Sequence, residues 1–316
     1  MNFYIHIGYP KAASTFLQKT ILPKLKNCNV LDKDKSEVRN QIFYRLITLD
    51  EAEYNKNKKN LINTLYQEVK KINKTDKIYV SWPGFINPIK FHTKTNPWGN
   101  NINRTILRIN EIFSNIGKVN FILIIRNYSD LIESFFNQIN HLLKFDFKDE
   151  HLIQALKKEN EKYKFLLDFF YFSRIINLFS NNKNNNSVIL YEDLIYDTLK
   201  FQKALADAFD NEEINTLDFD NLAKNRKNSR LEKNNITYKM KKIYEIFFTK
   251  KFKIYGNSKI SAYKTRLKGL IKILSIKNIN KENYNHLVSN YFMQDYDELP
   301  ENIKQQCKKY NYIDSK

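Results

Sequence analysis

One apolar run limits the folds open to this chain more than any other feature of its sequence. Residues 119–125, VNFILII, are apolar at every position but one. Such a run is typical of a strand in a parallel sheet that helices cover on both faces. Shorter strand patterns stand at residues 3–7, 77–82 and 187–194, and helical patterns separate them. Strands that alternate with helices predict an α/β fold with a central parallel sheet flanked by helices.

Helical periodicity fills most of the intervals between these strands. The expected helices cover residues 13–25, 102–116, 129–143, 151–180 and 198–209. Residues 33–76 are polar with helical patches, 181–186 (NNKNNN) form a polar loop, and two or three helices run to the C-terminus. We find no internal repeat. We therefore predict a single domain over residues 1–316, with a helical C-terminal part, 236–316, packed on it.

The composition and charge of the chain indicate which kinds of ligand and cellular environment suit this protein. Hydrophobic residues make up 42% of the chain, and the formal net charge is +19. This excess suits a ligand rich in phosphate or sulfate, but the lysines are scattered and no nucleic-acid-binding motif is present. No uncharged run approaches the roughly 20 residues of a membrane span, and no signal-peptide pattern opens the sequence. Cys28 and Cys307 fit free thiols in a reducing compartment. We expect a cytoplasmic protein that binds no nucleic acid and has no membrane span.

The loop after the first strand, residues 8–15 (GYPKAAST), has the composition of an anion site. Small residues let a backbone wrap around an oxyanion, and a helix N-terminus adds N–H groups. Lys11 adds a full charge inside the loop. The small residues and hydroxyl donors are Gly8, Ala12, Ala13, Ser14 and Thr15. The loop lacks the G-x-x-x-x-G-K-[ST] pattern of nucleotide-triphosphate loops. An ordinary strand–helix connection with a surface lysine is the alternative.

A second cationic position follows the long apolar strand, in the stretch IIRNYSDLIESFFNQ. Arg126 stands at the carboxyl end of that strand, and Ser134 lies eight residues further on, about two helical turns away. An arginine fork and a serine hydroxyl are able to share one phosphate. The carboxyl ends of parallel strands share one edge, so this site faces the first loop. The alternative is a structural arginine paired with Asp130 or Glu133.

Together these stretches resemble the sulfotransferases that use 3′-phosphoadenosine 5′-phosphosulfate (PAPS). GYPKAAST resembles the family's 5′-phosphosulfate loop, and RNYSDLIES (126–134) resembles its 3′-phosphate motif. Three later segments, LYEDL (190–194), KNRKNS (224–229) and YFMQDYDELPENIKQQC (291–307), resemble later family segments in the same order. The stretch IHIGYPKAASTFLQ looks most like bacterial members that act on carbohydrates or related acceptors. The resemblance implies a domain related to P-loop kinases, with PAPS as donor.

The resemblance also implies roles for individual residues. Lys11 would stabilise the leaving group during in-line transfer of a sulfuryl group. Arg226 and Lys227 would help to hold the 3′-phosphate, although a solvated charge run explains this pair equally well. No metal is required. The implied donor contacts are Gly8, Tyr9, Pro10, Lys11, Ala12, Ala13, Ser14, Thr15, Arg126, Ser134, Arg226 and Lys227.

The general base is where the chain departs from the family pattern. Many relatives have a Glu or a His after the second strand, but here the segment reads VSWPGF (80–85). The remaining candidates are His92, His141 and Glu133. Trp82 and Trp98 suit stacking on a sugar, and core packing is the alternative for Trp82. We expect a saccharide or glycoconjugate acceptor. A P-loop-type kinase of a small molecule and a non-catalytic polyanion-binding protein are the competing interpretations.

Overall fold

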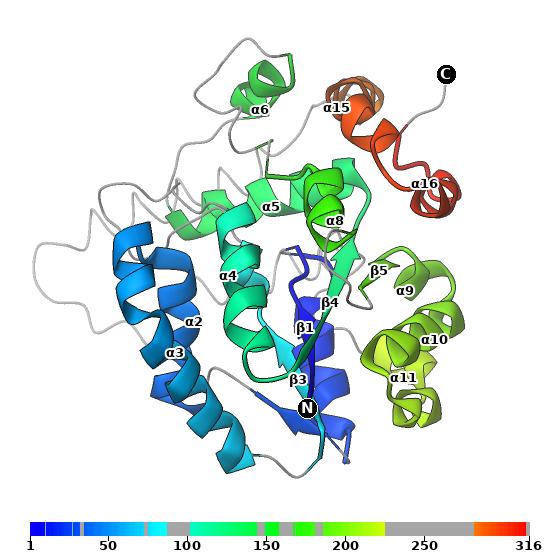
Figure 1. The fold of residues 1–316 in the computed structure, drawn as a ribbon. Helices are drawn as coiled ribbons and strands as arrows, with labels where there is room; N and C mark the ends of the chain where they lie inside the picture. Colours follow the sequence, from blue (N-terminus) through cyan, green and yellow to red (C-terminus); the bar gives the residue numbers. More distant parts are fainter. Residues whose placement is uncertain are drawn as a thin grey trace, which may run out of the picture. The chain divides into compact units, whose positions relative to one another are not determined.

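A computed structural model gives the arrangement of the helices and strands (Figure 1). It describes residues 1–9, 11–26, 28–31, 35–72, 75–86, 102–143, 149–157, 167, 169–180, 186–224 and 281–313. The chain divides into two units. The first comprises residues 1–223 and 284–316, and the second comprises residues 224–283. Most of the second unit, including the predicted boundary at residue 236, lies outside the described residues.

The first unit is built on five parallel strands in the order β2-β3-β1-β4-β5. The strands are β1 (Asn2–His6), β2 (Asn29–Val30), β3 (Lys77–Ser81), β4 (Lys118–Ile125) and β5 (Ser187–Leu190). In the centre of the sheet, Ile5 of β1 is in register with Val80 of β3 and Phe121 of β4. The predicted α/β fold with a parallel sheet is confirmed. The edge strand β2 was not predicted, because two residues give no periodic pattern.

The β4 strand forms the centre of the core. Every residue of β4 after Lys118 is buried, and burial of each large apolar side chain contributes about 2 kcal/mol of transfer free energy. Asn120 is the one polar residue in the run, and its side-chain amide donates a hydrogen bond of 3.2 Å to the carbonyl of Phe3 on β1. A buried amide with a partner costs little, which is why Asn120 is tolerated in the strand.

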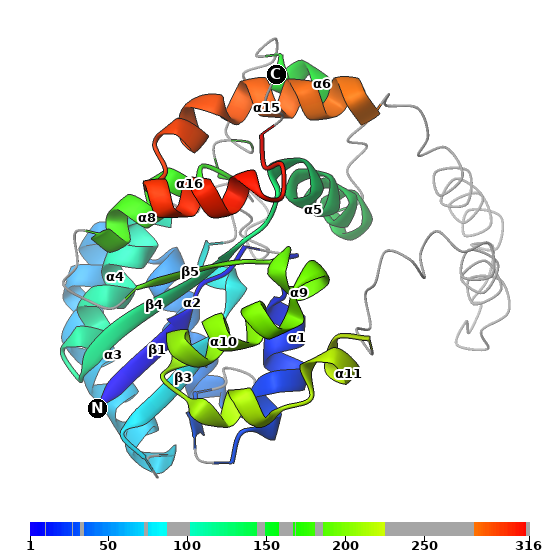
Figure 2. The same ribbon diagram turned by 90° about the vertical axis from the view of Figure 1, so that its right-hand side faces the viewer.

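Helices cover both faces of the sheet, as the apolar run of β4 predicts (Figures 1 and 2). One face carries α2 (Glu37–Thr48), α3 (Glu51–Ile72) and α4 (Ile102–Ser114). The other carries α1 (Ser14–Phe16), α9 (Asp193–Tyr196), α10 (Thr198–Phe209) and α11 (Phe219–Lys224). Helical structure continues after α1 to Lys24, through a π-helical stretch, Leu17–Ile21, and a 3-10 turn, Leu22–Lys24.

Further helices lie toward the carboxyl ends of the strands, opposite the end marked N (Figure 2). They include α5 (Tyr128–Leu143) and α15 (Lys281–Asp297), while α16 (Glu301–Lys308) contacts β5. The predicted helix 151–180 is seen as α6 (Asp149–Leu156) and α8 (Phe172–Ser180), and residues 158–166 between them lie outside the described part. Among the described helices, none is long and apolar enough to cross a membrane.

Candidate functional site

The order of the strands creates one place where a crevice is expected. From β1 the chain moves to β2 on one side of the sheet, whereas from β4 it moves to β5 on the other side. Since β1 and β4 are neighbours, the connections that leave their carboxyl ends diverge. Ligands of open parallel sheets bind at such a switch point. The two stretches that the sequence marks as anion sites are these two connections.

The backbone of the first loop adopts an unusual conformation. Lys11 and Ala13 have φ values of 71° and 57°, in the left-handed region. For a residue with a Cβ atom, this conformation costs roughly 1–2 kcal/mol of conformational free energy. The turn is closed by the N–H of Ala12, which donates to the carbonyl of Tyr9 at 3.1 Å. Backbone strain of this kind concentrates at functional sites, and alternating backbone conformations direct N–H groups into anion-binding concavities.

The helix that follows the loop begins without a side-chain cap. Ala13 occupies the N-cap position of α1, where Ser, Thr, Asp or Asn would normally accept a hydrogen bond from the first helical N–H groups. Ala13 has no side-chain oxygen. The N–H groups at the start of the helical segment from Ser14 to Lys24 therefore gain no acceptor from this position, which leaves them suited to an anion.

Arg126 joins the second stretch to the first loop. Its Nη1 donates to the carbonyl oxygen of Lys11 at 3.1 Å, across 115 residues of sequence. The buried guanidinium lies 4.7 Å from the centroid of the Tyr191 ring. Its Nη2 also lies 3.6 Å from a carboxylate oxygen of Asp130, so the structural pairing that the sequence left open is present as well. The predicted proximity of the two stretches is thus seen directly.

Three residues of β1 and of the two stretches carry buried polar atoms that make no hydrogen bond within the described part of the chain. The hydroxyl of Tyr9, Nε of Arg126 and Nε2 of His6 are buried and have no hydrogen-bond partner among the described residues. The ring of Tyr9 packs against Phe169 and Phe172, at centroid distances of 5.3 and 5.0 Å. Burial raises the pKa of Tyr9, which keeps the hydroxyl protonated. Unsatisfied buried donors are rare in native proteins, so those on Tyr9 and Arg126, one in each of the two stretches, are compatible with a ligand site.

His6 was missed by the sequence analysis. It ends β1 directly beneath the loop, and its Nδ1 lies 2.8 Å from Oγ of Ser81 at the end of β3. The carbonyl of Ser81 accepts a hydrogen bond of 2.7 Å from the amide of Gln18. Burial lowers the pKa of His6 to about 3, so the imidazole is neutral at physiological pH. A fully buried neutral ring supports the loop rather than reacting with a substrate.

The other predicted site residues are distributed around this core. Gly8, Tyr9, Ala12, Ala13 and Ser14 are buried, Lys11 and Ser134 are partly exposed, and Thr15 and Glu133 are exposed. Pro10, His92, Trp98, Arg226 and Lys227 lie outside the described residues, as does the side chain of His141 on α5. Trp82 stacks on Phe43 at a centroid distance of 5.6 Å, as its core-packing alternative predicts.

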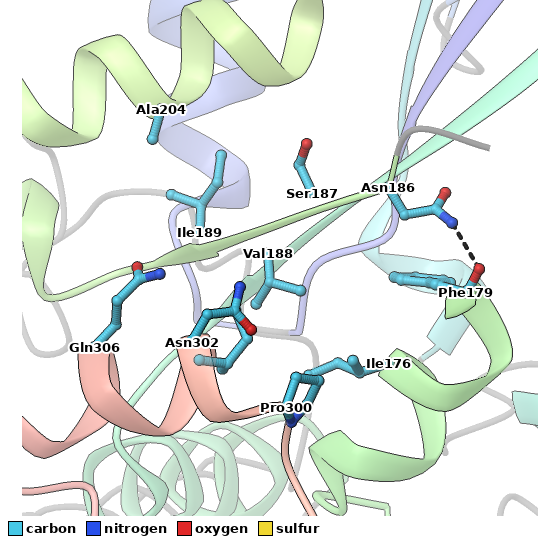
Figure 3. A pocket seen from close by; sticks show the side chains of 11 residues that line it. Ile176, Phe179, Asn186, Ser187, Val188, Ile189, Ala204, Pro300, Asn302 and Gln306 are labelled. Carbon is cyan, nitrogen blue, oxygen red and sulfur yellow. Dashed lines mark hydrogen bonds between the residues drawn. The ribbon is translucent and has the colours of Figure 1, made fainter. Parts of the chain in front are cut away.

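A separate groove of about 520 Å³ runs along the edge strand β5 (Figure 3). Its walls come from α8, β5, α10 and α16 and from the residues beside them. The lining residues are Ile176, Phe179, Asn186, Ser187, Val188, Ile189, Ala204, Pro300, Asn302, Ile303 and Gln306. None of these carries a charge, and the amide of Asn186 donates to the carbonyl of Phe179 at 2.8 Å. This lining does not suit a phosphate or sulfate.

Comparison with protein-family models, with curated proteins and with solved structures found no match to this chain. The assignment of function therefore depends on the sequence motifs and on the geometry of the two loops.

Proposed function

We propose that this protein is a sulfotransferase that moves a sulfuryl group from PAPS to a hydroxyl group of an acceptor. The observation that carries the proposal is the hydrogen bond from Arg126 to the carbonyl of Lys11. It joins a strained loop containing a lysine to a buried arginine at the switch point of a parallel sheet. Two adjacent cationic loops suit a nucleotide that carries an anionic group at each of two ribose positions.

The residues present fit this donor. Guanidinium has five N–H groups, and one of those on Arg126 is used by the Lys11 carbonyl. Its Nε is buried and has no partner among the described residues, and the proposal assigns the remaining N–H groups of the guanidinium to the phosphate. The nearby Asp130 carboxylate competes for the same cation. The fit therefore requires that the phosphate, which has the larger charge, binds the Arg126 guanidinium in place of the partly exposed carboxylate of Asp130.

In this proposal the chain contributes positioning and charge. PAPS supplies an activated sulfuryl group, and little covalent chemistry falls to the protein. The loop N–H groups, with Ser14 and Thr15, hold the 5′-phosphate, while Arg126 and Ser134 hold the 3′-phosphate. The ammonium group of Lys11 stabilises the negative charge that develops on the leaving oxygen. His92, His141 and Glu133 are the candidates for the group that takes the proton of the acceptor hydroxyl.

The acceptor that we propose is a saccharide or glycoconjugate. The support is the likeness of IHIGYPKAASTFLQ to carbohydrate-acting bacterial sulfotransferases. Trp82, which is partly exposed at the carboxyl end of β3, already stacks on Phe43, so it does not strengthen this part of the proposal.

Replacement of Lys11 tests the mechanism. We expect Lys11→Ala to lower kcat by about 10²-fold or more, the usual cost of removing a group that stabilises developing charge. Lys19→Ala is the matched control, because Lys19 is an exposed lysine on the helical segment that follows the loop, and its loss changes the net charge equally. Turnover would be followed as transfer of labelled sulfate from PAPS to a panel of saccharides. Near-normal turnover in folded Lys11→Ala would contradict the proposed role.

Ligand-dependent stabilisation separates the competing functions. A ligand that binds only the folded protein raises its melting temperature with concentration. We expect 3′-phosphoadenosine 5′-phosphate to raise the Tm more than ATP with Mg²⁺ at the same concentration. The reverse order would favour a kinase. Stabilisation by 3′-phosphoadenosine 5′-phosphate without sulfate transfer to any acceptor would favour the non-catalytic polyanion-binding alternative.

A further inference from the structure

The three residues that follow β4 are each held by side chains from much later in the sequence. The guanidinium of Arg126 lies against the ring of Tyr191. The hydroxyl of Tyr128 donates to Asp295 at 2.6 Å, and its ring stacks on Phe172 at a centroid distance of 4.4 Å. The direction in which the chain leaves β4 is therefore fixed by contacts with residues far along the sequence, and not by the start of α5 alone.

Asn127 is the most constrained of the three. Its backbone N–H donates to Oε1 of Glu192 at 3.0 Å. Its side-chain amide donates to the carbonyl of Asn311 at 2.8 Å and lies 3.4 Å from that of Tyr310. The other end of the amide accepts the N–H of Ser129 at 3.0 Å, which caps α5. One residue thus connects β4, α5 and the turn after α16.

We call Tyr310, Asn311 and Tyr312 the C-terminal clasp. The hydroxyl of Tyr312 donates to Oε2 of Glu192, and both side chains are buried. The hydroxyl of Tyr310 donates to Oδ1 of Asp193 at 2.6 Å. The two carboxylates of the segment LYEDL therefore each accept one tyrosine hydroxyl from the clasp, and Glu192 also accepts the N–H of Asn127.

Glu192 lies close enough to Arg126 to interact with its charge, but its carboxylate oxygens accept hydrogen bonds from the Asn127 N–H and the Tyr312 hydroxyl. Burial raises the pKa of Glu192, while the Tyr312 hydroxyl, the Asn127 N–H and the charge of Arg126 favour the ionised form. A buried carboxylate that loses a donor becomes costly and rearranges or takes up a proton. Removal of the Tyr312 hydroxyl would therefore disturb the hydrogen bond between Glu192 and the N–H of Asn127, the residue next to Arg126. Tyr312 itself belongs to neither predicted anion loop.

We propose that Glu192 and Tyr312 are positioning residues for the 3′-phosphate site, which act through the N–H of Asn127 to fix the direction of Arg126. The inference rests on the proposed function, because it assigns Arg126 to the 3′-phosphate. A purely structural role of the clasp would affect the affinity of every nucleotide equally. A positioning role affects only nucleotides that carry the 3′-phosphate.

The test compares 3′-phosphoadenosine 5′-phosphate with adenosine 5′-phosphate by calorimetric titration of the full chain. We expect Tyr312→Phe to weaken binding of the first nucleotide by about tenfold, the effect of one hydrogen bond to a charged group. Binding of adenosine 5′-phosphate should stay unchanged. Phenylalanine keeps the ring of Tyr312, whose centroid lies 6.2 Å from that of Tyr128, so packing is preserved.

Tyr296→Phe is the matched control. Its hydroxyl donates to the carbonyl of Lys304 at 3.1 Å, in the same C-terminal part of the chain. It should leave the preference for the 3′-phosphate intact. If Tyr312→Phe does not fold, Glu192→Gln takes its place, with a loss of the same preference as the expected result.

Two outcomes would overturn the inference, and they differ. If the wild type prefers the 3′-phosphorylated nucleotide and the clasp variant keeps that preference in full, the positioning role is wrong and the proposed function stands. If the wild type itself shows no preference for the 3′-phosphate, the proposed function fails and the positioning role fails with it.

Discussion

Gly8 illustrates how one buried side chain sets the identity of its neighbour. A Cβ atom on Gly8 would lie 2.3 Å from Nε2 of His6, far inside van der Waals contact. The imidazole has little freedom to move, because it is fully buried and its Nδ1 lies within hydrogen-bonding distance of Ser81. The glycine that the sequence suggests as a close-approach position for an oxyanion therefore has a second reason to be there, which is the packing of His6 under the loop.

The neutral state of His6 gives a testable pH dependence. In the unfolded chain the pKa of histidine is about 6.5, whereas in the folded protein burial lowers it to about 3. Between these values the unfolded state binds the additional proton, so stability falls as the pH falls. From pH 7.5 to pH 5 the free energy of unfolding should decrease by about 2 kcal/mol more in the wild type than in His6→Asn.

Urea unfolding at the two pH values measures this difference. The titrations of the other groups are shared by the wild type and the variant, so they cancel in the comparison. Equal pH dependence of the two proteins would show that His6 is not held neutral in the folded state.

At the scale of elements, α8 links the two loops. Phe172, its first residue, packs against Tyr9 of the first loop and Tyr128 after β4. The helix start is fixed by Asp295 of α15, which accepts hydrogen bonds of 2.7 and 2.9 Å from the N–H groups of Phe172 and Ser173. A carboxylate from a distant helix therefore acts as the N-terminal cap that local sequence usually provides.

Removal of this cap should be costly. Asp295 is fully buried and also accepts the hydroxyls of Tyr128 and Ser173. Asp295→Ala leaves several buried donors without an acceptor, and we expect the free energy of unfolding to drop by about 3 kcal/mol or more. Asp297→Ala, an exposed position on the same helix, should change it by less than about 0.5 kcal/mol. Denaturant titration of both variants checks this, and equal small effects would contradict the capping role.

At the scale of the whole molecule, the sequence predicts what depends on periodicity and on strand ends. The run at β4 and the alternation of strands and helices indicate the parallel sheet. The carboxyl ends of parallel strands share one edge, so the proximity of Arg126 to the loop of Lys11 follows from their places in the sequence. The contact is seen as the hydrogen bond between them.

Contacts that join distant polar residues were not predictable in this way. Nothing in the pattern around His6 indicates Ser81 as its neighbour, and the pairing of Glu192 with Tyr312 spans 120 residues. The π-helical stretch from Leu17 to Ile21 likewise has no periodic signal of its own, since its residues also fit an α-helix. These features arise from tertiary packing, which single-sequence patterns do not encode.

The clasp at residues 310–312 also affects the order in which the molecule becomes complete. Translation proceeds from the N-terminus, so the ribosome has delivered all five strands well before it reaches Tyr310. The nascent chain is then able to form its sheet and its first loop before the carbonyls of Tyr310 and Asn311, which accept from the amide of Asn127, have been synthesised. The contacts that hold Asn127 beside Arg126 are therefore completed late, after the sheet has been synthesised.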